Sequence, residues 1–378
     1  MSIYLDNAAT TKPCREAVKA ACDCMEENFG NPSSLHKAGL AAQLAVDNVR
    51  KIIAKAIAAD PSCIYFTSGA TESNNIAIIG TAGAYGKRKP KIVTTSIEHS
   101  SVEKTMEYLE QNGFEIVRIS PDRNGLISHE QIINAVDENT CLVSMMMVNN
   151  ETGYILPVRR CFYGIKKLYP QCITHCDAVQ GFMKMPFKVS ELSADIISFS
   201  GHKVHAGKGV GGLYVKKGVR LEPRIFGGGQ EKGVRSGTEN VPMIASLGAA
   251  VKSLNASISE RYKKAEELKA KLCAKISATD GIHINSHEDA SPYIINISVP
   301  GIRSEIMLHF LEEKDIFVSS GSACSKGAKS GVLKEFGIND SFADSALRIS
   351  ISHETTAADL SKLINGIQDA METLVKAR

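Results

Sequence analysis

The sequence predicts an α/β fold in which a large domain, built on a mostly parallel mixed sheet flanked by helices, is joined to a smaller C-terminal α/β domain. Two observations support this prediction. Up to about residue 240, apolar runs of strand length alternate with longer amphipathic segments, which is typical of right-handed βαβ units. Beyond that point a long segment rich in Glu, Lys and Ala precedes a second, shorter set of strands and helices.

In the large domain a strand is expected where apolar residues run together, and a helix where they recur every three or four residues. The run 141–148 is continuously apolar and ends at Asn149-Asn150, as in a strand that is buried on both faces. The expected strands are 63–68, 91–96, 114–119, 141–148, 172–176, 195–200 and 211–215. The expected helices are 73–85, 101–111, 129–136 and a segment around 160–168.

One long helix over 241–276 is expected to bridge the two domains. We expect the large domain to comprise residues 15–255 and the small domain to comprise residues 1–14 and 256–378. The small domain is expected to contain strands at 293–299, 316–319 and 346–351, and helices at 304–313 and 357–376.

Composition excludes several classes of protein. The chain has 378 residues, 44 of them basic and 41 acidic, with a net charge of +3, so charge gives no case for binding nucleic acid or an anionic membrane. Its ten cysteines are too sparse for a disulfide-stapled protein of this size. Because no apolar run approaches the ~18 residues of a membrane span and the first residues do not resemble a signal peptide, we expect a cytoplasmic protein.

Several polar residues follow expected strands, where open α/β sheets collect ligands. Residues 67–73 (TSGATES) lie between a strand and a helix. They form either a phosphate cradle or a turn in which Thr71 or Ser73 caps the helix. His99 follows the next strand, as a cap or as a functional residue, and the segment 149–153 is, taken alone, a turn.

The pair Asp177 and Gln180 follows a further strand, where the carboxylate could hold a protonated ring nitrogen or cap a turn. Lys203 ends the buried strand 195–200 beside hydroxyls and a histidine. Burial and neighbouring cations lower the pKa of a lysine and make it nucleophilic, as a Schiff-base lysine must be. Taken alone, however, a single lysine in this place is better explained by a structural role.

Two residues of the small domain stand out. Cys324 lies in a loop of small residues, with Lys326 and Lys329 close by; the environment favours the thiolate, although the thiol could be incidental. Arg348 lies inside an apolar strand and requires an anionic partner. No metal is assigned, because Cys22-x-Cys24 and Cys172-x3-Cys176 lack the pairing of a structural zinc site.

Together these segments resemble the pyridoxal-phosphate-dependent cysteine desulfurases of the NifS/IscS type, in the class V aminotransferase family, whose fold is the type I fold of pyridoxal-phosphate transferases. The resemblance runs in family order from residue 4 to about residue 350. Its segments are YLDNAATT (4–11), FGNPSSLH (29–36), FTSGATESNN (66–75), EH (98–99), VNNETG (148–153), HCDAVQG (175–181), SFSGHK (198–203), GGGQEKGVRSGTEN (227–240), SSGSAC (319–324) and ALRIS (346–350).

The resemblance implies a role for each matching residue. Lys203 would bind pyridoxal 5'-phosphate and move the substrate's α-proton, His99 would stack on the ring and assist proton transfer, and Cys324 would take the sulfur as a persulfide. Asp177 would hold the ring nitrogen and Gln180 would approach the ring hydroxyl. Asn150 and Arg348 would bind the substrate carboxylate. The phosphate would be held by Ala70, Thr71, Ser200 and His202, together with Thr238 from the second subunit of a homodimer.

The implied reaction converts L-cysteine to L-alanine and passes sulfur to an acceptor or scaffold protein for iron–sulfur cluster, thio-cofactor or tRNA biosynthesis. A selenocysteine lyase, a class V aminotransferase and a catalytically idle cofactor-binding partner remain alternatives. The chain departs from the family at Gly207, where a proline is expected and the turn could be looser, and at His353. The stretch from Cys324 to Phe336 also looks shorter, which leaves the acceptor open.

Overall fold

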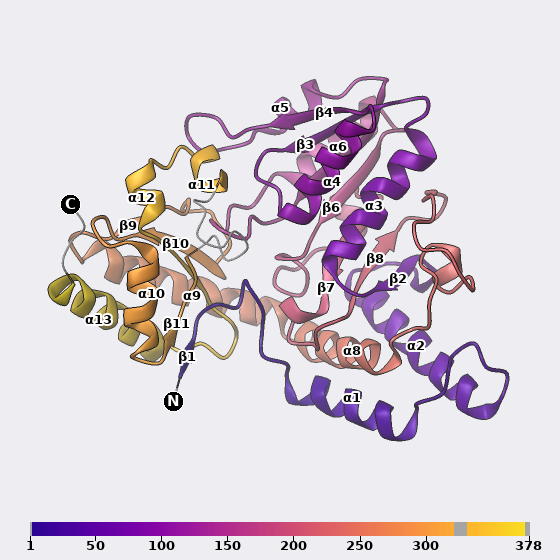
Figure 1. Cartoon of the computed structure of the whole chain (residues 1–378), viewed down its shortest axis with the longest axis horizontal. Helices are drawn as coiled ribbons and strands as arrows, with labels where there is room; N and C mark the ends of the chain where they lie inside the picture. Colours follow the sequence, from indigo (N-terminus) through magenta and orange to yellow (C-terminus); the bar gives the residue numbers. More distant parts are fainter. Residues whose placement is uncertain (1, 321–330, 375–378) are drawn as a thin grey trace.

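The large part of the molecule is built on a seven-stranded mixed sheet (Figure 1). This computed structural model describes residues 2–320 and 331–374. The strand order is β2-β8-β7-β6-β5-β3-β4, and all neighbouring pairs are parallel except those of β8, which runs antiparallel to both β2 and β7. The strands are β2 (Ile64–Thr67), β3 (Lys91–Thr95), β4 (Glu115–Ile119), β5 (Thr140–Met146), β6 (Ile173–Asp177), β7 (Ile196–Ser200) and β8 (Gly211–Val215).

Helices cover both faces of this sheet, as its apolar central strands require. Helices α3 and α4 bury one hydrophobic cluster, with Ile78 and Met106 completely buried in it. A larger cluster lies over α2, α6 and α8 and continues into the small part. The helices are α1 (Arg15–Glu27), α2 (Lys37–Ala56), α3 (Ala70–Tyr85), α4 (Ser100–Gln111), α5 (His129–Asn134), α6 (Val158–Leu168), α7 (Val189–Leu192) and α8 (Val241–Asn255).

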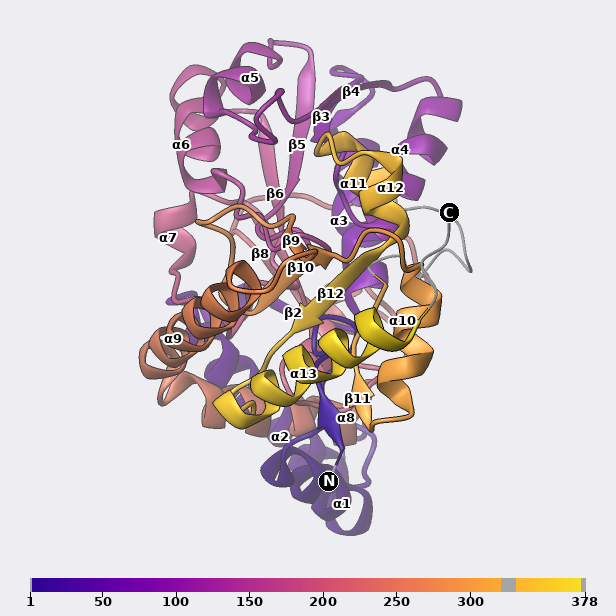
Figure 2. The same ribbon diagram turned by 90° about the vertical axis from the view of Figure 1, so that its left-hand side faces the viewer.

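The smaller part holds an antiparallel sheet of order β12-β10-β9 and a parallel pair β1–β11 (Figure 2). Strand β1, near the N-terminus, pairs with β11, and Asp6 forms a separate bridge to Ser350, the last residue of β12. The N-terminal segment therefore lies against strands that are more than 300 residues away in the sequence. The elements are β1 (Ile3–Tyr4), α9 (Ile258–Ser277), β9 (His283–Ile284), β10 (Ile294–Ser298), α10 (Ser304–Glu312), β11 (Ile316–Phe317), α11 (Gly331–Glu335), α12 (Asp340–Asp344), β12 (Ala346–Ser350) and α13 (Ala357–Thr373).

The prediction of one helix over 241–276 is wrong. The segment forms two helices, α8 and α9, which are bent by 72° at a short break. Arg261 in the first turns of α9 donates to the Leu254 carbonyl near the end of α8, which helps to hold the bend. Among the helices of 2–320 and 331–374, none is by itself long and apolar enough to cross a membrane; α8 and α9 meet those limits only as this bent pair.

Candidate active site

The candidate site lies where the N-terminal segment crosses the carboxyl ends of the central strands. The 3-10 turn Gly201–Lys203 follows β7 directly. It directs the ammonium of Lys203 to the carbonyls of Ala8 and Ala9, at 2.6 Å and 2.7 Å. The reactive amine expected from the sequence is therefore half-buried and held by backbone acceptors rather than extended into solvent.

His99 faces the same edge of the sheet as the N-cap of α4. Its Nδ1 accepts from the Ser101 backbone N–H at 3.1 Å, so the neutral ring carries its proton on Nε2. Burial lowers the pKa of His99, Asp177 opposes that shift, and Lys203 lowers the pKa further. The three sequence-predicted residues thus lie within electrostatic reach of one another, and His99 is a cap as well as a site residue.

Asp177, the last residue of β6, is buried. Its carboxylate accepts from the Val179 N–H at 3.0 Å and from Asn74 Nδ2 at 2.8 Å. The same Asn74 nitrogen donates to Ser101 Oγ at 2.9 Å. Asn74 therefore ties the carboxylate to the turn that holds His99.

The segment after β2 has the form of an anion cradle. Helix α3 starts at Ala70 with Gly69 at the N-cap and with no side-chain cap, so neither Thr71 nor Ser73 caps it; Ser73 Oγ instead donates to the Gly212 carbonyl at 3.1 Å. A Cβ on Gly69 would meet nothing within 4 Å. The helix is sixteen residues long, and its uncapped N-terminus leaves backbone N–H groups and a positive dipole directed at open space.

Ser200 and His202 lie beside this cradle. Ser200 pairs with Gly211 across the sheet, and the Cα of Gly69 lies 2.7 Å from where a Cβ on Gly211 would be. In the described part of the chain the buried Ser200 Oγ has no hydrogen-bond partner. Burial and nearby lysines lower the pKa of His202 to about 4, which leaves it neutral at neutral pH.

Arg348 in β12 brings a guanidinium to the site from the small part. It donates to Asp6 Oδ1 at 2.8 Å and to the Asn150 carbonyl at 3.1 Å. Its buried Nε has no partner among the described residues, so a donor remains for a bound anion. Ser319 pairs with Arg348 through backbone bonds in both directions, so the segment that leads to Cys324 starts beside this arginine; Cys324 itself lies outside the described residues.

Gln180 shares a backbone acceptor with Lys203. Its Nε2 donates to the Ala8 carbonyl at 3.0 Å, the same oxygen that accepts from Lys203. Its Oε1 accepts from the buried Lys184 at 2.7 Å. Thr238 is not brought to this site: it is exposed and lines a separate groove with Phe29 at the end of α1.

Two of the three departures from the expected pattern are structurally accommodated; the third, the stretch from Cys324 to Phe336, begins outside the described residues. The Gly207 N–H donates to Ser246 Oγ at 3.0 Å, a bond that a proline could not make, so this turn is tied to α8. His353 packs edge-on against His205, with ring centroids 4.6 Å apart.

The side chains and backbone groups observed at this site are suited to bind pyridoxal phosphate. A buried carboxylate, an orphaned serine hydroxyl, an uncapped helix N-terminus and a lysine amine lie around one edge of the sheet. The carboxylate matches a ring nitrogen, the hydroxyl and the helix N-terminus match a phosphate, and the amine matches an aldehyde. Asn74 and the Ala8 and Ala9 carbonyls were not singled out from the sequence, although Asn74 lies one turn into the helix that follows the cradle.

Comparison with known proteins gives a consistent picture. The family model Aminotransferase class-V matches residues 3–363. The cysteine desulfurase IscS of Methanosarcina thermophila is 36% identical over 376 residues, 99% of this chain and 93% of that protein. A solved NifS-like protein has a TM-score of 0.93 at 37% identity and covers 99% of this chain and 100% of its own. A structure of SspA in complex with cysteine has a TM-score of 0.83 at 33% identity, covering 94% and 100%.

Proposed function

The chain belongs to the aminotransferase class V family, with the type I fold of pyridoxal-phosphate transferases, and is a cysteine desulfurase; we propose which of its residues bind cofactor and substrate and move sulfur. The observation that carries this assignment of residues is the meeting of Lys203, His99 and Asp177 at the anion cradle. L-cysteine is the proposed substrate, in keeping with the cysteine complex of the related SspA.

The cofactor is proposed to be pyridoxal 5'-phosphate. When bound it withdraws electrons from the substrate's α-carbon. Lys203 would hold it covalently, Asp177 would keep its ring nitrogen protonated, and His99 would cover the ring. The N–H groups of Ala70 and Thr71 would hold its phosphate.

Two further side chains complete the proposed phosphate site, Ser200 through its unpartnered hydroxyl and His202. Because the pKa of His202 is lowered to about 4, its neutral ring contributes a hydrogen bond rather than a full charge.

The substrate carboxylate is proposed to bind Arg348 and Asn150. Arg348 has its buried Nε available, and a guanidinium fork suits a carboxylate. With the carboxylate held there, the Lys203 amine, once the substrate's amine has replaced it on the cofactor, would remove the α-hydrogen as a proton. His99, neutral and protonated on Nε2, exchanges a proton with the substrate sulfur.

Cys324 then attacks that sulfur. The C–S bond of cysteine breaks, an S–S bond forms on Cys324, and the carbon that loses sulfur gains a proton. L-cysteine and the Cys324 thiol therefore give L-alanine and a Cys324 persulfide, with no external oxidant or reductant. The persulfide is passed to an acceptor or scaffold protein.

The test compares wild type, Cys324→Ala and Lys203→Ala, each supplied with pyridoxal phosphate, L-cysteine and a thiol reductant. Wild type should release alanine and sulfide in equal amounts. Cys324→Ala should keep the absorption band near ~420 nm that marks the lysine-bound cofactor but release little sulfide. Lys203→Ala should lose both the band and the products.

Other outcomes would identify the alternatives. Alanine and sulfide that persist in Cys324→Ala would remove Cys324 from the mechanism. A cofactor-bound wild type that transfers amino groups to 2-oxo acids without releasing sulfide would indicate an aminotransferase. Faster turnover of L-selenocysteine that does not need Cys324 would indicate a selenocysteine lyase.

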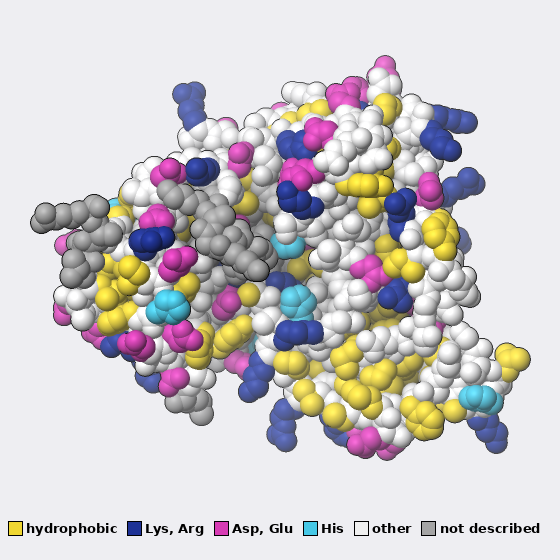
Figure 3. Space-filling view, in the orientation of Figure 1, with side chains coloured by type: hydrophobic (Ala, Val, Ile, Leu, Met, Phe, Trp, Pro, Cys, Tyr) yellow, Lys and Arg dark blue, Asp and Glu magenta, His cyan; other side chains and the backbone are white. Residues whose placement is uncertain are grey.

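A homodimer is the proposed assembly. Large apolar side chains are exposed over α1 and α2 (Figure 3), and Phe29 and Phe226 are 77% and 82% exposed. Contiguous apolar surface of this kind marks an interface. Thr238 lies in the groove beside Phe29, which is consistent with its serving a partner's phosphate site rather than its own.

Sedimentation of wild type and Phe226→Glu tests the assembly. Wild type should sediment at twice the chain mass. The Phe226→Glu dimer should be weaker and should dissociate into monomers at a higher protein concentration than the wild-type dimer. Tyr163→Glu on α6, another exposed aromatic outside this surface, is the matched control. A monomeric wild type with full activity would refute the proposal.

A further inference from the structure

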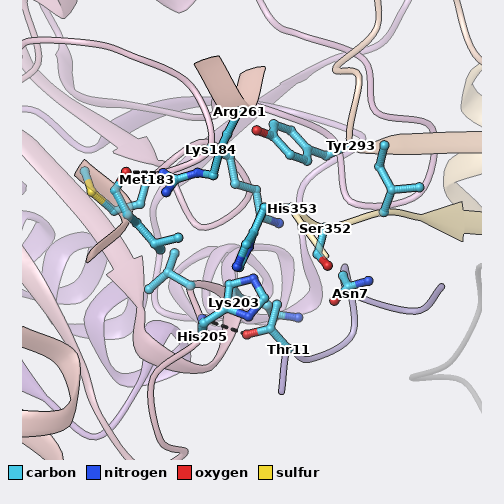
Figure 4. Close-up of a pocket in the computed structure, with 13 residues that line it drawn as sticks. Asn7, Thr11, Met183, Lys184, Lys203, His205, Arg261, Tyr293, Ser352 and His353 are labelled. Atoms are coloured by element: carbon cyan, nitrogen blue, oxygen red, sulfur yellow. Dashed lines mark hydrogen bonds between the residues drawn. The ribbon is translucent and has the colours of Figure 1, made fainter. Parts of the chain in front are cut away.

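Lys184 is a buried lysine next to the site that the proposed mechanism does not use. It follows β6 and lines a cavity together with Lys203, His205, Arg261 and His353 (Figure 4). Its ammonium donates to Gln180 Oε1 at 2.7 Å. A lysine this deeply buried is unusual and calls for a specific role.

The contacts of Gln180 fix the orientation of its amide. An ammonium can only donate a hydrogen bond and a carbonyl oxygen can only accept one. Lys184 therefore requires the amide oxygen on its own side, and the Ala8 carbonyl, 3.0 Å from Nε2, requires the amide nitrogen on the other. That same carbonyl accepts from Lys203 at 2.6 Å, so the amide nitrogen, and not the amide oxygen, lies beside the Lys203 amine.

We propose that Lys184 is a positioning residue that holds the Gln180 amide with its N–H groups towards Lys203 and the cofactor bound there. This inference rests on the proposed function, because it gives Gln180 a donor role at the cofactor. Without the ammonium, only the Ala8 carbonyl would still favour this orientation, and the amide would be free to rotate and present its oxygen to the Lys203 amine, which can donate to it. An acceptor there would stabilise a proton on the Lys203 nitrogen, whereas a donor does not.

The charge of Lys184 depends on its surroundings. Burial, Lys203 and Arg348 lower the pKa of Lys184 to about 7. The cavity lining contains no carboxylate among the described residues. The other titratable groups that share the cavity or feel the charge of Lys184 are His202, His205, Arg261, Tyr293 and His353.

The ammonium of Lys184 also disfavours a proton on Lys203 directly, since like charges oppose each other's ionisation. Loss of Lys184 therefore has two effects on the ionisation of Lys203, and both have the same sign. Both the missing charge and the rotated amide raise the pH at which the Lys203 nitrogen loses its proton.

The experiment is a double-mutant cycle with Lys184→Met and Gln180→Ala on the cofactor-loaded protein. The first readout is the pH midpoint of the absorption band near ~420 nm. Lys184→Met should raise that midpoint by about one pH unit, the size of shift that one nearby charge causes. The second readout is turnover: kcat should fall about tenfold, with KM for L-cysteine changed less than about twofold.

The cycle separates positioning from general damage. In a Gln180→Ala background, Lys184→Met should cause less than about a twofold further loss in kcat, because the two residues act as one unit. Lys269→Met is the matched control: Lys269 is a half-buried lysine on α9 that donates to the Ala290 carbonyl at 2.6 Å. The Lys269→Met variant should leave both the pH midpoint of the absorption band and kcat unchanged.

Each result decides the proposal. Additive losses, or a midpoint unchanged in Lys184→Met, would overturn it while the proposed function stands. If Lys184→Met does not fold, Lys184→Gln decides, since its amide can still donate to Gln180. A kcat within about threefold of wild type supports positioning, and a loss as large as that of Gln180→Ala overturns it. A wild type without the absorption band overturns the proposed function and this inference together.

Discussion

His175 should make the protein lose stability as the pH falls below the ordinary pKa of histidine. This side chain lies inside the large sheet, completely buried, with Ser144 Oγ and Ser198 Oγ each 2.8 Å from one of its ring nitrogens. Burial lowers its pKa to about 3. Because the folded pKa is below the unfolded one, its contribution to stability is present above the unfolded pKa and is lost as the pH falls through it.

The magnitude follows from proton linkage. Between about pH 7.5 and about pH 5, an unfolded histidine with a pKa of about 6.5 takes up a proton while the folded side chain stays neutral, which costs about 2 kcal/mol. The value depends only on the unfolded pKa, as long as the folded pKa stays below about 4.

The assay is urea unfolding followed by circular dichroism at the two pH values, since the chain has no tryptophan. In His175→Gln, the drop in the free energy of unfolding should be smaller than in wild type by about 2 kcal/mol. His309→Gln, at an exposed position, is the control and should keep the wild-type drop. If His175→Gln keeps it as well, His175 is not the group that titrates.

Two further predictions follow from single hydrogen bonds. Asn74→Ala removes the donor to Asp177 and should raise the dissociation constant of pyridoxal phosphate about tenfold, the worth of one buried charge-assisted bond; equilibrium dialysis measures it, and Asn75→Ala should have no such effect. Gly207→Pro removes the N–H that Ser246 accepts and should lower the free energy of unfolding by about 1–3 kcal/mol; an unchanged urea midpoint would show that this bond contributes nothing.

Most of the large sheet could be predicted because its strands are continuous apolar runs. The run 141–148 corresponds to β5, Thr140–Met146. Strand β1, only two residues long, could not be predicted because it exists through its pairing with β11. The bend between α8 and α9 was missed for a similar reason, since helical residues continue through a break of two residues that tertiary contacts fix.

The same distinction separates the site residues that could be predicted from the sequence from those that could not. Residues with unusual chemistry at strand ends, such as Lys203 and Asp177, were predicted because the fold class brings those ends together. Asn74 was not, because its role depends on one hydrogen bond to Asp177, which is far away in the sequence. Lys184 was not, because its burial beside Gln180 appears only in the folded structure. The Ala8 carbonyl carries no sequence signal at all, since every residue has one.

The crossing of the N-terminal segment also sets the order in which the site can be completed. Asp6 and Asn7 precede the strands of the large sheet in the chain, yet Asp6 pairs with Arg348 and Asn7 donates to the Ser350 carbonyl. Domains generally fold from the N-terminus during synthesis, so the large sheet can form while these residues still lack partners. The N-terminal segment is therefore fixed across the site only when strand β12, made more than 300 residues later, is available to pair with it.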